Sequence, residues 1–191
     1  NFFERNFIEQ NHQGVSILCN KRLEENEIFL EKLLKKDNLL FLILDHLTDP
    51  HNVGACLRSA AAAGADAVIV PKNRSCHLTP TVRKISSGGS ELMPFIVVTN
   101  LNRTIQRLSD SGVKIIGAAA DTGKNHTEID MKGSAAFIIG SEDKGLKRLT
   151  AEKCDTLAAI DMPGGIESLN AAVTAGIILF EYVRQNNHSK T

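Results

Sequence analysis

Short apolar segments alternate with amphipathic or small-residue segments from residue 39 onward. The apolar segments are rich in β-branched residues and bounded by turn residues, which is the pattern of buried strands. They cover residues 39–44, 67–70, 94–99, 113–118, 135–139 and 156–160. The segments between them predict helices at residues 52–63, 101–111 and 170–185. This alternation is typical of an α/β fold in which helices flank one parallel sheet.

The first 38 residues differ from the rest because they are polar and rich in charge, with one helix-like stretch at residues 27–36. We expect residues 1–38 to be a leader or the remnant of a longer N-terminal region. Residues 39–191 are long enough for one well-buried α/β domain. A Gly- and Ser-rich stretch at residues 86–90 is the one further linker that we expect.

Composition and charge exclude several function classes. The 191 residues include 22 basic and 22 acidic side chains, so no overall field attracts nucleic acid and any RNA contact must be local. The four cysteines form no C-x-x-C pair and the six histidines show no zinc spacing, which argues against a metal site and a disulfide framework. No apolar run reaches about 20 residues and no signal pattern opens the chain, so we expect a soluble, cytoplasmic protein.

Two glycine-bounded polar loops, residues 140–145 and 162–170, follow two of the predicted strands. Ligands of open α/β sheets bind outside the carboxyl ends of strands, so these loops are the first candidates for chemistry. The first loop lacks the Gly-Lys-Ser/Thr ending of a phosphate loop, and its Glu142 and Asp143 would repel phosphate. No G-x-G-x-x-G follows the first strand. Nucleoside triphosphates and nicotinamide cofactors are therefore both disfavoured.

Polar side chains in three places are candidates for function, and each has a structural alternative. Asn52 begins a predicted helix and is either a cap or a binding group. Arg58 lies among small and apolar residues, where we expect it to reach a partner, and the alternative is a structural salt bridge. Glu142 is either a partner for Arg58 or for a cationic ligand, and the alternative is a solvated acid in a turn. Ser168 and Asn170 either cap the last helix or offer donors to a ribose or phosphate oxygen.

Taken in order, three motifs resemble those of the SpoU-type RNA ribose 2′-O-methyltransferases of the SPOUT superfamily. The motifs are Asn52-x-Gly54-x-x-x-Arg58, Gly140-x-Glu142-x-x-Gly145, and Ile160-x-Met162-x-Gly164 running to Ser168-Leu169-Asn170. The resemblance covers residues 39–185, and the order and spacing of the motifs make chance agreement improbable. Flanking segments, among them residues 48–52 and 69–72, are similar to the bacterial branch that methylates a guanosine of 23S ribosomal RNA.

The resemblance implies a parallel sheet whose C-terminal segment forms a deep trefoil knot, a rare exception to ordinary connections. It also implies binding of S-adenosylmethionine within the knot and a homodimer formed through the last helix. Members of the ribosomal branch carry a small N-terminal RNA-binding domain, of which residues 1–38 are the expected remnant. By position, the residues expected to line the cofactor pocket are Gly140, Gly145, Ile160, Met162 and Leu169.

One position departs from the family's pattern. The third motif usually reads Ile-Pro-Met, whereas here Asp161 replaces the proline and Pro163 follows Met162. We therefore expect a loop of different shape, with the extra carboxylate either near the sulfonium of the cofactor or in solvent.

The implied reaction is attack of a ribose 2′-hydroxyl on the methyl group of the cofactor, and the family assigns catalysis to Arg58. A free guanidinium has a pKa of roughly 12 or more. Deprotonating it near neutrality would cost about 7 kcal/mol. We therefore expect Arg58 to hold an RNA phosphate and stabilise the developing alkoxide, while Glu142 orients Arg58 and Asn52 helps to fix the loop. The edge formed by Ser168 and Asn170 is expected to contribute by positioning the reactants.

RNA contact needs positive charge, and Lys72, Arg74, Arg83 and Lys84 supply it after the second predicted strand. The alternative for these residues is a solvated basic surface. With no Trp and a single Tyr, base stacking is poorly provided for, so we expect target choice to rest on RNA shape or on the N-terminal domain. Two other functions fit the same motifs, namely a transfer-RNA ribose 2′-O-methyltransferase and a catalytically silent RNA-binding or ribosome-assembly module.

Overall fold

The computed structural model describes residues 20–120, 124–141 and 143–187. This part of the chain contains a six-stranded sheet in the order β3-β2-β1-β5-β4-β6, and every neighbouring pair of strands is parallel. The predicted parallel α/β sheet is therefore confirmed, with each strand within one or two residues of its predicted bounds. The strands are β1 (Leu40–Leu44), β2 (Ala67–Pro71), β3 (Phe95–Val98), β4 (Lys114–Ala118), β5 (Ala135–Ile139) and β6 (Thr156–Ala158).

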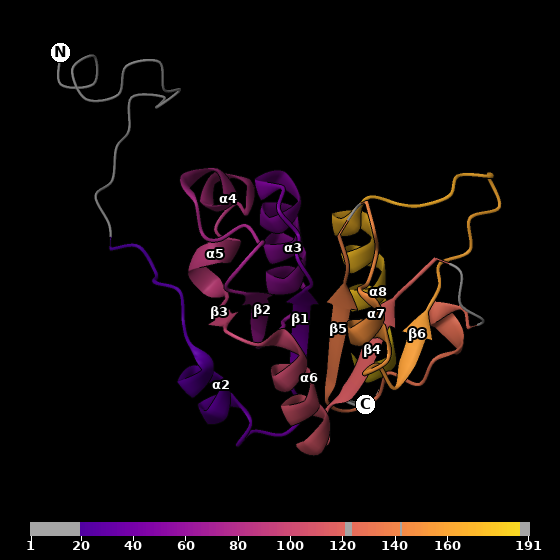
Figure 1. Cartoon of the computed structure of the whole chain (residues 1–191), viewed down its shortest axis with the longest axis horizontal. Coiled ribbons are helices and arrows are strands. Elements are labelled where there is room, and N and C mark those ends of the chain that lie inside the picture. Colours follow the sequence, from indigo (N-terminus) through magenta and orange to yellow (C-terminus); the bar gives the residue numbers. More distant parts are fainter. Residues whose placement is uncertain (1–19, 121–123, 142, 188–191) are drawn as a thin grey trace, which may run out of the picture.

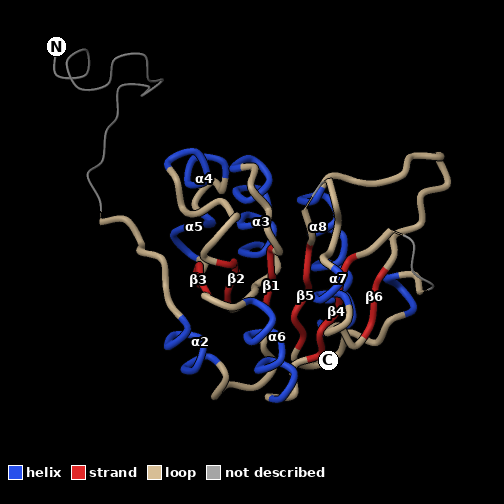
Figure 2. The backbone as a smooth tube through the Cα atoms, in the orientation of Figure 1, coloured by secondary structure: helices blue, strands red, loops and turns tan. Residues whose placement is uncertain are grey.

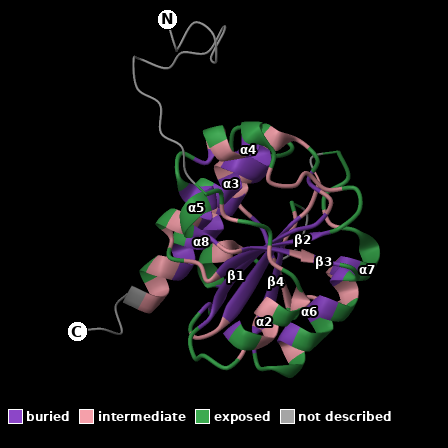
Figure 3. Ribbon diagram, turned by 90° about the vertical axis from the view of Figure 1, so that its left-hand side faces the viewer, coloured by how far each residue is buried: buried purple, intermediate pink, exposed green. Residues whose placement is uncertain are grey.

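Helices cover both faces of the sheet (Figures 1 and 2). One layer is formed by α3, α4, α5 and α8, and the other by α2 and α6, because two separate apolar clusters join these helices to opposite faces of the strands. Figure 3 shows the sheet buried between helices whose outer faces are exposed. The helices are α2 (Glu27–Leu33), α3 (Pro50–Ala62), α4 (Pro80–Ile85), α5 (Gly89–Leu92), α6 (Leu101–Asp110), the 3-10 helix η1 (His126–Glu128), α7 (Arg148–Ala151) and α8 (Ala171–Asn187).

The strands are apolar along their whole length because both faces of the sheet are covered. Every residue of β1, β2 and β5 is buried, which is typical of a doubly covered parallel sheet. At the centre, β1 pairs with β5 from Leu40 opposite Ala135 to Leu44 opposite Ile139. This register places the loops that follow β1 and β5 side by side at the carboxyl edge of the sheet.

The predicted linker at residues 86–90 is wrong. Ser86 and Ser90 are buried, and the Ser86 hydroxyl accepts a hydrogen bond from the Ser90 amide at 3.1 Å. A Cβ atom on Gly89 would lie 3.1 Å from the Leu57 carbonyl oxygen of α3, so the backbone packs directly on that helix. Small residues in this segment allow close packing of α5 on α3 rather than flexibility.

Residues 20–38 include the predicted N-terminal helix, which is confirmed as α2. Leu30 and Leu33 of this helix are buried in the cluster between α2, α6 and the sheet. Just before it, the Glu25 amide donates to the Phe95 carbonyl at 2.8 Å, alongside the edge strand β3. The described part of the expected leader therefore shares the core of the α/β body. The division at residue 39 stays a prediction.

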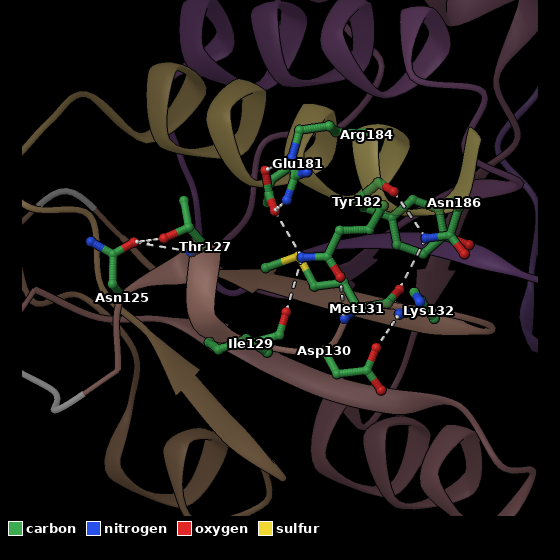
Figure 4. A network of polar contacts seen from close by, with 11 residues as sticks. Asn125, Thr127, Ile129, Asp130, Met131, Lys132, Glu181, Tyr182, Arg184 and Asn186 are labelled. Atoms are coloured by element: carbon green, nitrogen blue, oxygen red, sulfur yellow. Dashed lines mark hydrogen bonds and ion pairs between the residues drawn. The ribbon is translucent and has the colours of Figure 1, made fainter. Parts of the chain in front are cut away.

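The last helix is tied to the segment that leads into β5 by hydrogen bonds to its backbone (Figure 4). The Gln185 side-chain oxygen accepts from the Met131 amide at 2.9 Å, and the Asn186 side-chain oxygen accepts from the Gly133 amide at 3.1 Å. Tyr182 donates its hydroxyl to the Gly133 carbonyl at 2.9 Å. These side chains satisfy backbone groups of a loop that belongs to no sheet or helix.

Glu181 orients this network from one turn earlier on α8. Its carboxylate accepts from the Arg184 guanidinium at 2.7 and 2.8 Å and from the Gln185 amide at 2.8 Å. The hydrogen bonds from Arg184 lower the pKa of Glu181 to about 2, against the opposing effect of burial. The carboxylate therefore stays ionised and holds Gln185 towards the loop.

Within the described residues, no helix is both long and apolar enough to span a lipid bilayer.

We expect Gln185→Ala to lower the free energy of unfolding by about 2 kcal/mol, because it leaves the buried Met131 amide without an acceptor. Urea unfolding followed by circular dichroism measures the change. The control is Gln106→Ala, which removes an exposed amide bonded to Asp110 and Lys153 and should change stability by less than about 0.5 kcal/mol. Equal effects of the two variants would contradict a role of Gln185 in holding the loop.

Candidate active site

A pocket opens at the carboxyl ends of β4, β5 and β6, beside the start of α8. Its walls are small or apolar on the strand side and partly polar at the rim. The lining residues are Ala118, Ala119, Ala120, Ile139, Gly140, Ser141, Ala158, Ile160, Met162, Ser168, Leu169, Ala171 and Thr174. The pocket therefore lies between the two polar loops that were singled out in the sequence.

A tight turn forms the wall that follows β5. The amide and carbonyl of Ser141 bond to the carbonyl and amide of Gly145 at 3.1 and 2.8 Å. A Cβ atom on Gly140 would lie 2.1 Å from the Gly145 carbonyl carbon, and Gly145 itself has a positive φ of 61°. Only glycine fits the first position without moving the backbone. The turn presents bare backbone to the pocket.

Four of the five residues expected to line the cofactor pocket do line this cavity, namely Gly140, Ile160, Met162 and Leu169. Gly145 is not among the lining residues, and instead closes the turn behind Gly140. The alanines at the ends of β4 and β6 belong to none of the motifs. Ala118 and Ala158 lie near the carboxyl ends of the predicted strand segments 113–118 and 156–160, and that position was the available signal.

A hydrogen bond joins two of the motifs across 118 residues. The Asn170 side-chain amide donates to the Asn52 side-chain oxygen at 2.8 Å, while the Asn170 oxygen accepts from the Ala172 and Val173 amides at 2.9 and 3.3 Å. Asn170 thus caps α8 and binds α3 at the same time. Asn52 is only 9% exposed, so its side chain is committed to this contact.

Asn52 does not begin its helix, contrary to the prediction. Asp49 is the N-cap of α3, because its carboxylate accepts from the His51 amide at 3.0 Å, and Pro50 occupies the first turn. Proline is favoured at the first helical position and would have identified this start. Asn52 consequently lies inside the first turn and faces α8, and Arg58 falls on the third turn.

Arg58 is exposed, so the expectation that its charge is buried in an apolar helix is wrong. The buried face of α3 is formed by its neighbours Cys56, Leu57 and Ala60. The Arg58 guanidinium donates a long hydrogen bond of 3.5 Å to the Ser87 hydroxyl. In the part of the chain that the structure describes, no carboxylate lies at ion-pair distance from the Arg58 guanidinium.

The remaining motif residues differ in how far their surroundings are known. Glu142 lies outside the described residues, so its predicted contact with Arg58 stays a prediction. Ser168 is exposed and lines the rim of the pocket. The carboxylate of Asp161 accepts from the Asn125 amide at 2.7 Å, which ties the third motif to the segment that follows β4.

Three of the four basic residues predicted to contact RNA are exposed, namely Lys72, Arg74 and Lys84. Arg83 is engaged in the protein, because it pairs with Glu91 at 2.7 Å and donates to the Arg22 carbonyl at 2.6 Å. The contact of Arg83 with RNA stays a prediction, and in the free protein its guanidinium is already bonded to Glu91 and to the Arg22 carbonyl.

Metal chemistry has no candidate ligands in the described part of the chain, where no group of three His, Cys, Asp or Glu side chains converges. Cys76 and Cys154 are free thiols. Burial, reinforced by Asp155 and Asp45, raises the pKa of the Cys154 thiol to about 12, so it stays protonated.

The SpoU rRNA methylase family model matches residues 39–180, which include all three motifs and the pocket. The chain belongs to the SpoU rRNA methylase family. It is 45% identical over 181 residues to the 23S rRNA (guanosine-2′-O-)-methyltransferase RlmB of Pseudomonas putida, covering 94% of this chain and 73% of the relative. The corresponding RlmB of Coxiella burnetii is 49% identical over 178 residues, which are 92% of this chain and 71% of the relative.

The fold agrees with a solved SpoU structure. The SpoU methyltransferase AviRb from Streptomyces viridochromogenes, in complex with the cofactor AdoMet, superposes with a TM-score of 0.75 at 27% sequence identity. The match covers 82% of this chain and 64% of AviRb. The chain therefore spans less than two thirds of that structure. The predicted family is confirmed.

We expect Gly140→Ala to weaken binding of S-adenosylmethionine at least tenfold, because the added Cβ collides with the backbone of Gly145 and moves the pocket wall. Isothermal titration calorimetry with the cofactor measures the affinity. The control is Gly176→Ala, where the nearest atom to the new Cβ is the Ser59 hydroxyl oxygen at 3.8 Å, an ordinary contact. An unchanged affinity for Gly140→Ala would show that the cofactor binds elsewhere.

Proposed function

We propose that this chain uses S-adenosylmethionine to methylate the ribose 2′-oxygen of a guanosine in 23S ribosomal RNA. One observation carries the proposal: the second and third family motifs line a single pocket, and the first is joined to them because Asn170 donates to Asn52 at 2.8 Å. The relatives that share 45–49% identity over more than nine tenths of the chain are named for this reaction on 23S rRNA.

The pocket suits the proposed cofactor because its walls combine flat apolar surface with bare backbone. Ala118, Ala158 and Leu169 offer apolar contacts to the faces of a purine ring. The turn at Gly140 and Ser141 brings main-chain polar groups to the same cavity, where they can bond to the edge of the base. When bound, S-adenosylmethionine supplies an electrophilic methyl group on a sulfonium.

Arg58 provides positive charge on α3, the helix that Asn170 of the pocket loop binds through Asn52. Because it is exposed and bonded to the protein only through the long contact with Ser87, its guanidinium is available to an RNA phosphate. The same charge stabilises the ribose oxygen as it loses its proton. In this proposal Glu142 orients Arg58. Since a guanidinium holds its proton near neutrality, Arg58 acts through charge and position.

Asn52, Ser168 and Asn170 are proposed to position the ribose. Asn170 fixes the start of α8 against α3, so the exposed Ser168 at the pocket rim and Arg58 on α3 are held on elements that touch each other. Alignment of this kind contributes about 7 to 11 kcal/mol in well-oriented reactions. In this proposal, most of the rate enhancement comes from alignment of the ribose 2′-oxygen with the methyl group of the cofactor.

A trefoil knot in the C-terminal segment is part of the proposal. It is supported by the order of the elements, because β6 joins the edge of the sheet beside β4 while α8 returns to pack on α3 and β5. In Figure 1 the segment between β6 and α8 runs from that edge of the sheet back to the start of α8. The hydrogen bonds from Gln185 and Asn186 hold the β4–β5 connection against α8.

A homodimer through α8 is also proposed. Val173 and Phe180 are 49% and 50% exposed, and with the partly exposed Ile177 they form one apolar stripe at a spacing of four and three residues. A second copy of the chain is the proposed occupant, in agreement with the family. The ribosomal-RNA substrate places the proposed activity in the cytoplasm, with target choice resting on RNA shape or on an N-terminal RNA-binding region.

We expect Arg58→Ala to reduce methyl transfer at least 100-fold while binding of S-adenosylmethionine stays within twofold. The loss follows from removal of a charge at the developing alkoxide, where single donors contribute about 10² to 10³ in rate. Transfer of labelled methyl to unmodified 23S rRNA, followed by nuclease mapping of 2′-O-methylguanosine, gives the result. Arg107→Ala on α6 is the matched control and should keep wild-type activity.

The same assay decides between the proposed function and its alternatives. Label only in transfer RNA would keep the mechanism and change the substrate. No label in either RNA, with the cofactor bound normally, would support a silent RNA-binding module. Near-full activity of Arg58→Ala would overturn the role given to Arg58.

We expect Phe180→Asp to raise the dimer dissociation constant roughly 100-fold, because an unpaired carboxylate in an apolar interface costs several kcal/mol. Light scattering after size exclusion should show one chain instead of two. The control is Ile28→Asp, since Ile28 is 67% exposed on α2 at the other face of the sheet. A wild-type chain that is already monomeric would contradict the dimer.

A further inference from the structure

A second cavity lies at the same carboxyl edge of the sheet, at the ends of β1, β2 and β3. It differs from the cofactor pocket because its lining is mostly polar and includes three basic side chains. The lining residues are Asp45, His46, Pro71, Asn73, Arg74, Thr99, Asn100, Leu101, Asn102, Lys147 and Thr150. None of the three motifs contributes to it.

The two cavities adjoin each other through the pairing of β1 with β5. The Asp45 amide, at the second cavity, donates to the Ile139 carbonyl at 2.8 Å, and Ile139 lines the cofactor pocket. Lys147 follows the Gly140–Gly145 turn by two residues. The two cavities are therefore neighbours at the carboxyl edge of the sheet.

A chain of three side chains holds a lysine at this cavity. The buried carboxylate of Asp45 bonds to Nδ1 of His46 and accepts from the Thr150 hydroxyl at 2.7 Å. Nε2 of His46 lies 2.7 Å from Nζ of Lys147. An ammonium can only donate, so the imidazole carries its proton on Nδ1 and accepts on Nε2. The Asp45 carboxylate is thus bonded to His46 and Thr150, and His46 in turn holds the ammonium of Lys147 in place.

Arg74 and the start of α6 complete the positive lining. Among the described residues, the Arg74 guanidinium has no hydrogen-bond or ion-pair partner. Leu101 and Asn102 begin α6, where amide groups lack acceptors within the helix and the helix dipole is positive. The side-chain oxygen of Asn102 is buried without a partner in the described chain. Donors for an anion therefore surround the same space.

Two residues of this cavity have left-handed backbone conformations that non-glycine residues rarely adopt. The φ angles are 63° at His46 and 56° at Arg74. Such conformations cost free energy and persist where the side chain or the surrounding structure requires them. Here both side chains face the same polar cavity, and one of them supports Lys147.

We propose that Arg74, Lys147 and the first amides of α6 bind a phosphodiester group of the RNA backbone, with His46 as the residue that positions Lys147. The site rests on the proposed function, because RNA is its ligand. A phosphate matches two cations and free amides. The site gives the substrate a second fixed point beside the reacting ribose.

The test measures RNA affinity of the 191-residue chain against salt concentration, with a 23S rRNA fragment and with an unrelated RNA of equal length. Loss of one phosphate contact reduces the slope of log K against log salt by about 1, equally for both RNAs. We expect this reduction in Lys147→Ala and in Arg74→Ala. Affinity for S-adenosylmethionine should not change. The matched controls, Lys132→Ala and Arg107→Ala, should keep the wild-type slope.

His46→Gly separates positioning from folding, because glycine accepts the left-handed backbone. We expect a lower melting temperature, because the buried Asp45 carboxylate loses its imidazole partner, but normal binding of S-adenosylmethionine, together with RNA binding weakened severalfold and a smaller effect of adding Lys147→Ala. Unchanged slopes in both Lys147→Ala and Arg74→Ala, or no RNA binding by the wild-type chain, would overturn the site. Slope changes without any methyl transfer would overturn the proposed reaction and leave the phosphate site standing.

Discussion

The pairing of β1 with β5 is the interaction on which the rest of the structure depends. It joins two apolar segments nearly a hundred residues apart in the middle of the sheet, with five residues of each strand in register and all of them buried. Because both strands are parallel, their following loops emerge at one edge. The start of α3, the Gly140–Gly145 turn and the His46–Lys147 contact all lie in these loops. A slip of one residue would turn every side chain to the other face and separate them.

The strands and long helices could be predicted from the sequence because their signals are local. A sheet buried on both faces produces uninterrupted apolar segments, and the glycines after residues 63 and 111 mark helix ends. The two short helices α4 and α5 were not predicted, since segments of six and four residues have little periodicity to detect. The serines and glycines of residues 86–90 suggested a linker, whereas they allow α5 to pack closely on α3, a tertiary requirement that the local sequence does not record.

The candidate site was predictable to the extent that motifs carry it. Gly140, Ile160, Met162 and Leu169 were located by the resemblance and lie around one pocket. The burial expected for Arg58 was wrong because it was judged from the composition of its helix, while exposure is set by the face of the helix that a residue occupies. The Asp45–His46–Lys147 chain had no sequence signal, because it joins residues about a hundred positions apart through the central strand pairing.

An exposed Arg58 changes how the site is expected to work. In water a charge pair at 4 Å is worth about 1 kcal/mol, and at an effective dielectric constant of 20 it is worth about 4 kcal/mol. In the free protein the Arg58 guanidinium is surrounded by water. Bound RNA excludes water and lowers the effective dielectric constant around the guanidinium. A chain with 22 basic and 22 acidic residues has no overall field to bring that RNA in. In the proposed function, local cations at fixed points supply both the attraction and the alignment, with Arg58 at the reacting ribose and Arg74 with Lys147 beside it, so the catalytic environment is completed only in the complex with RNA.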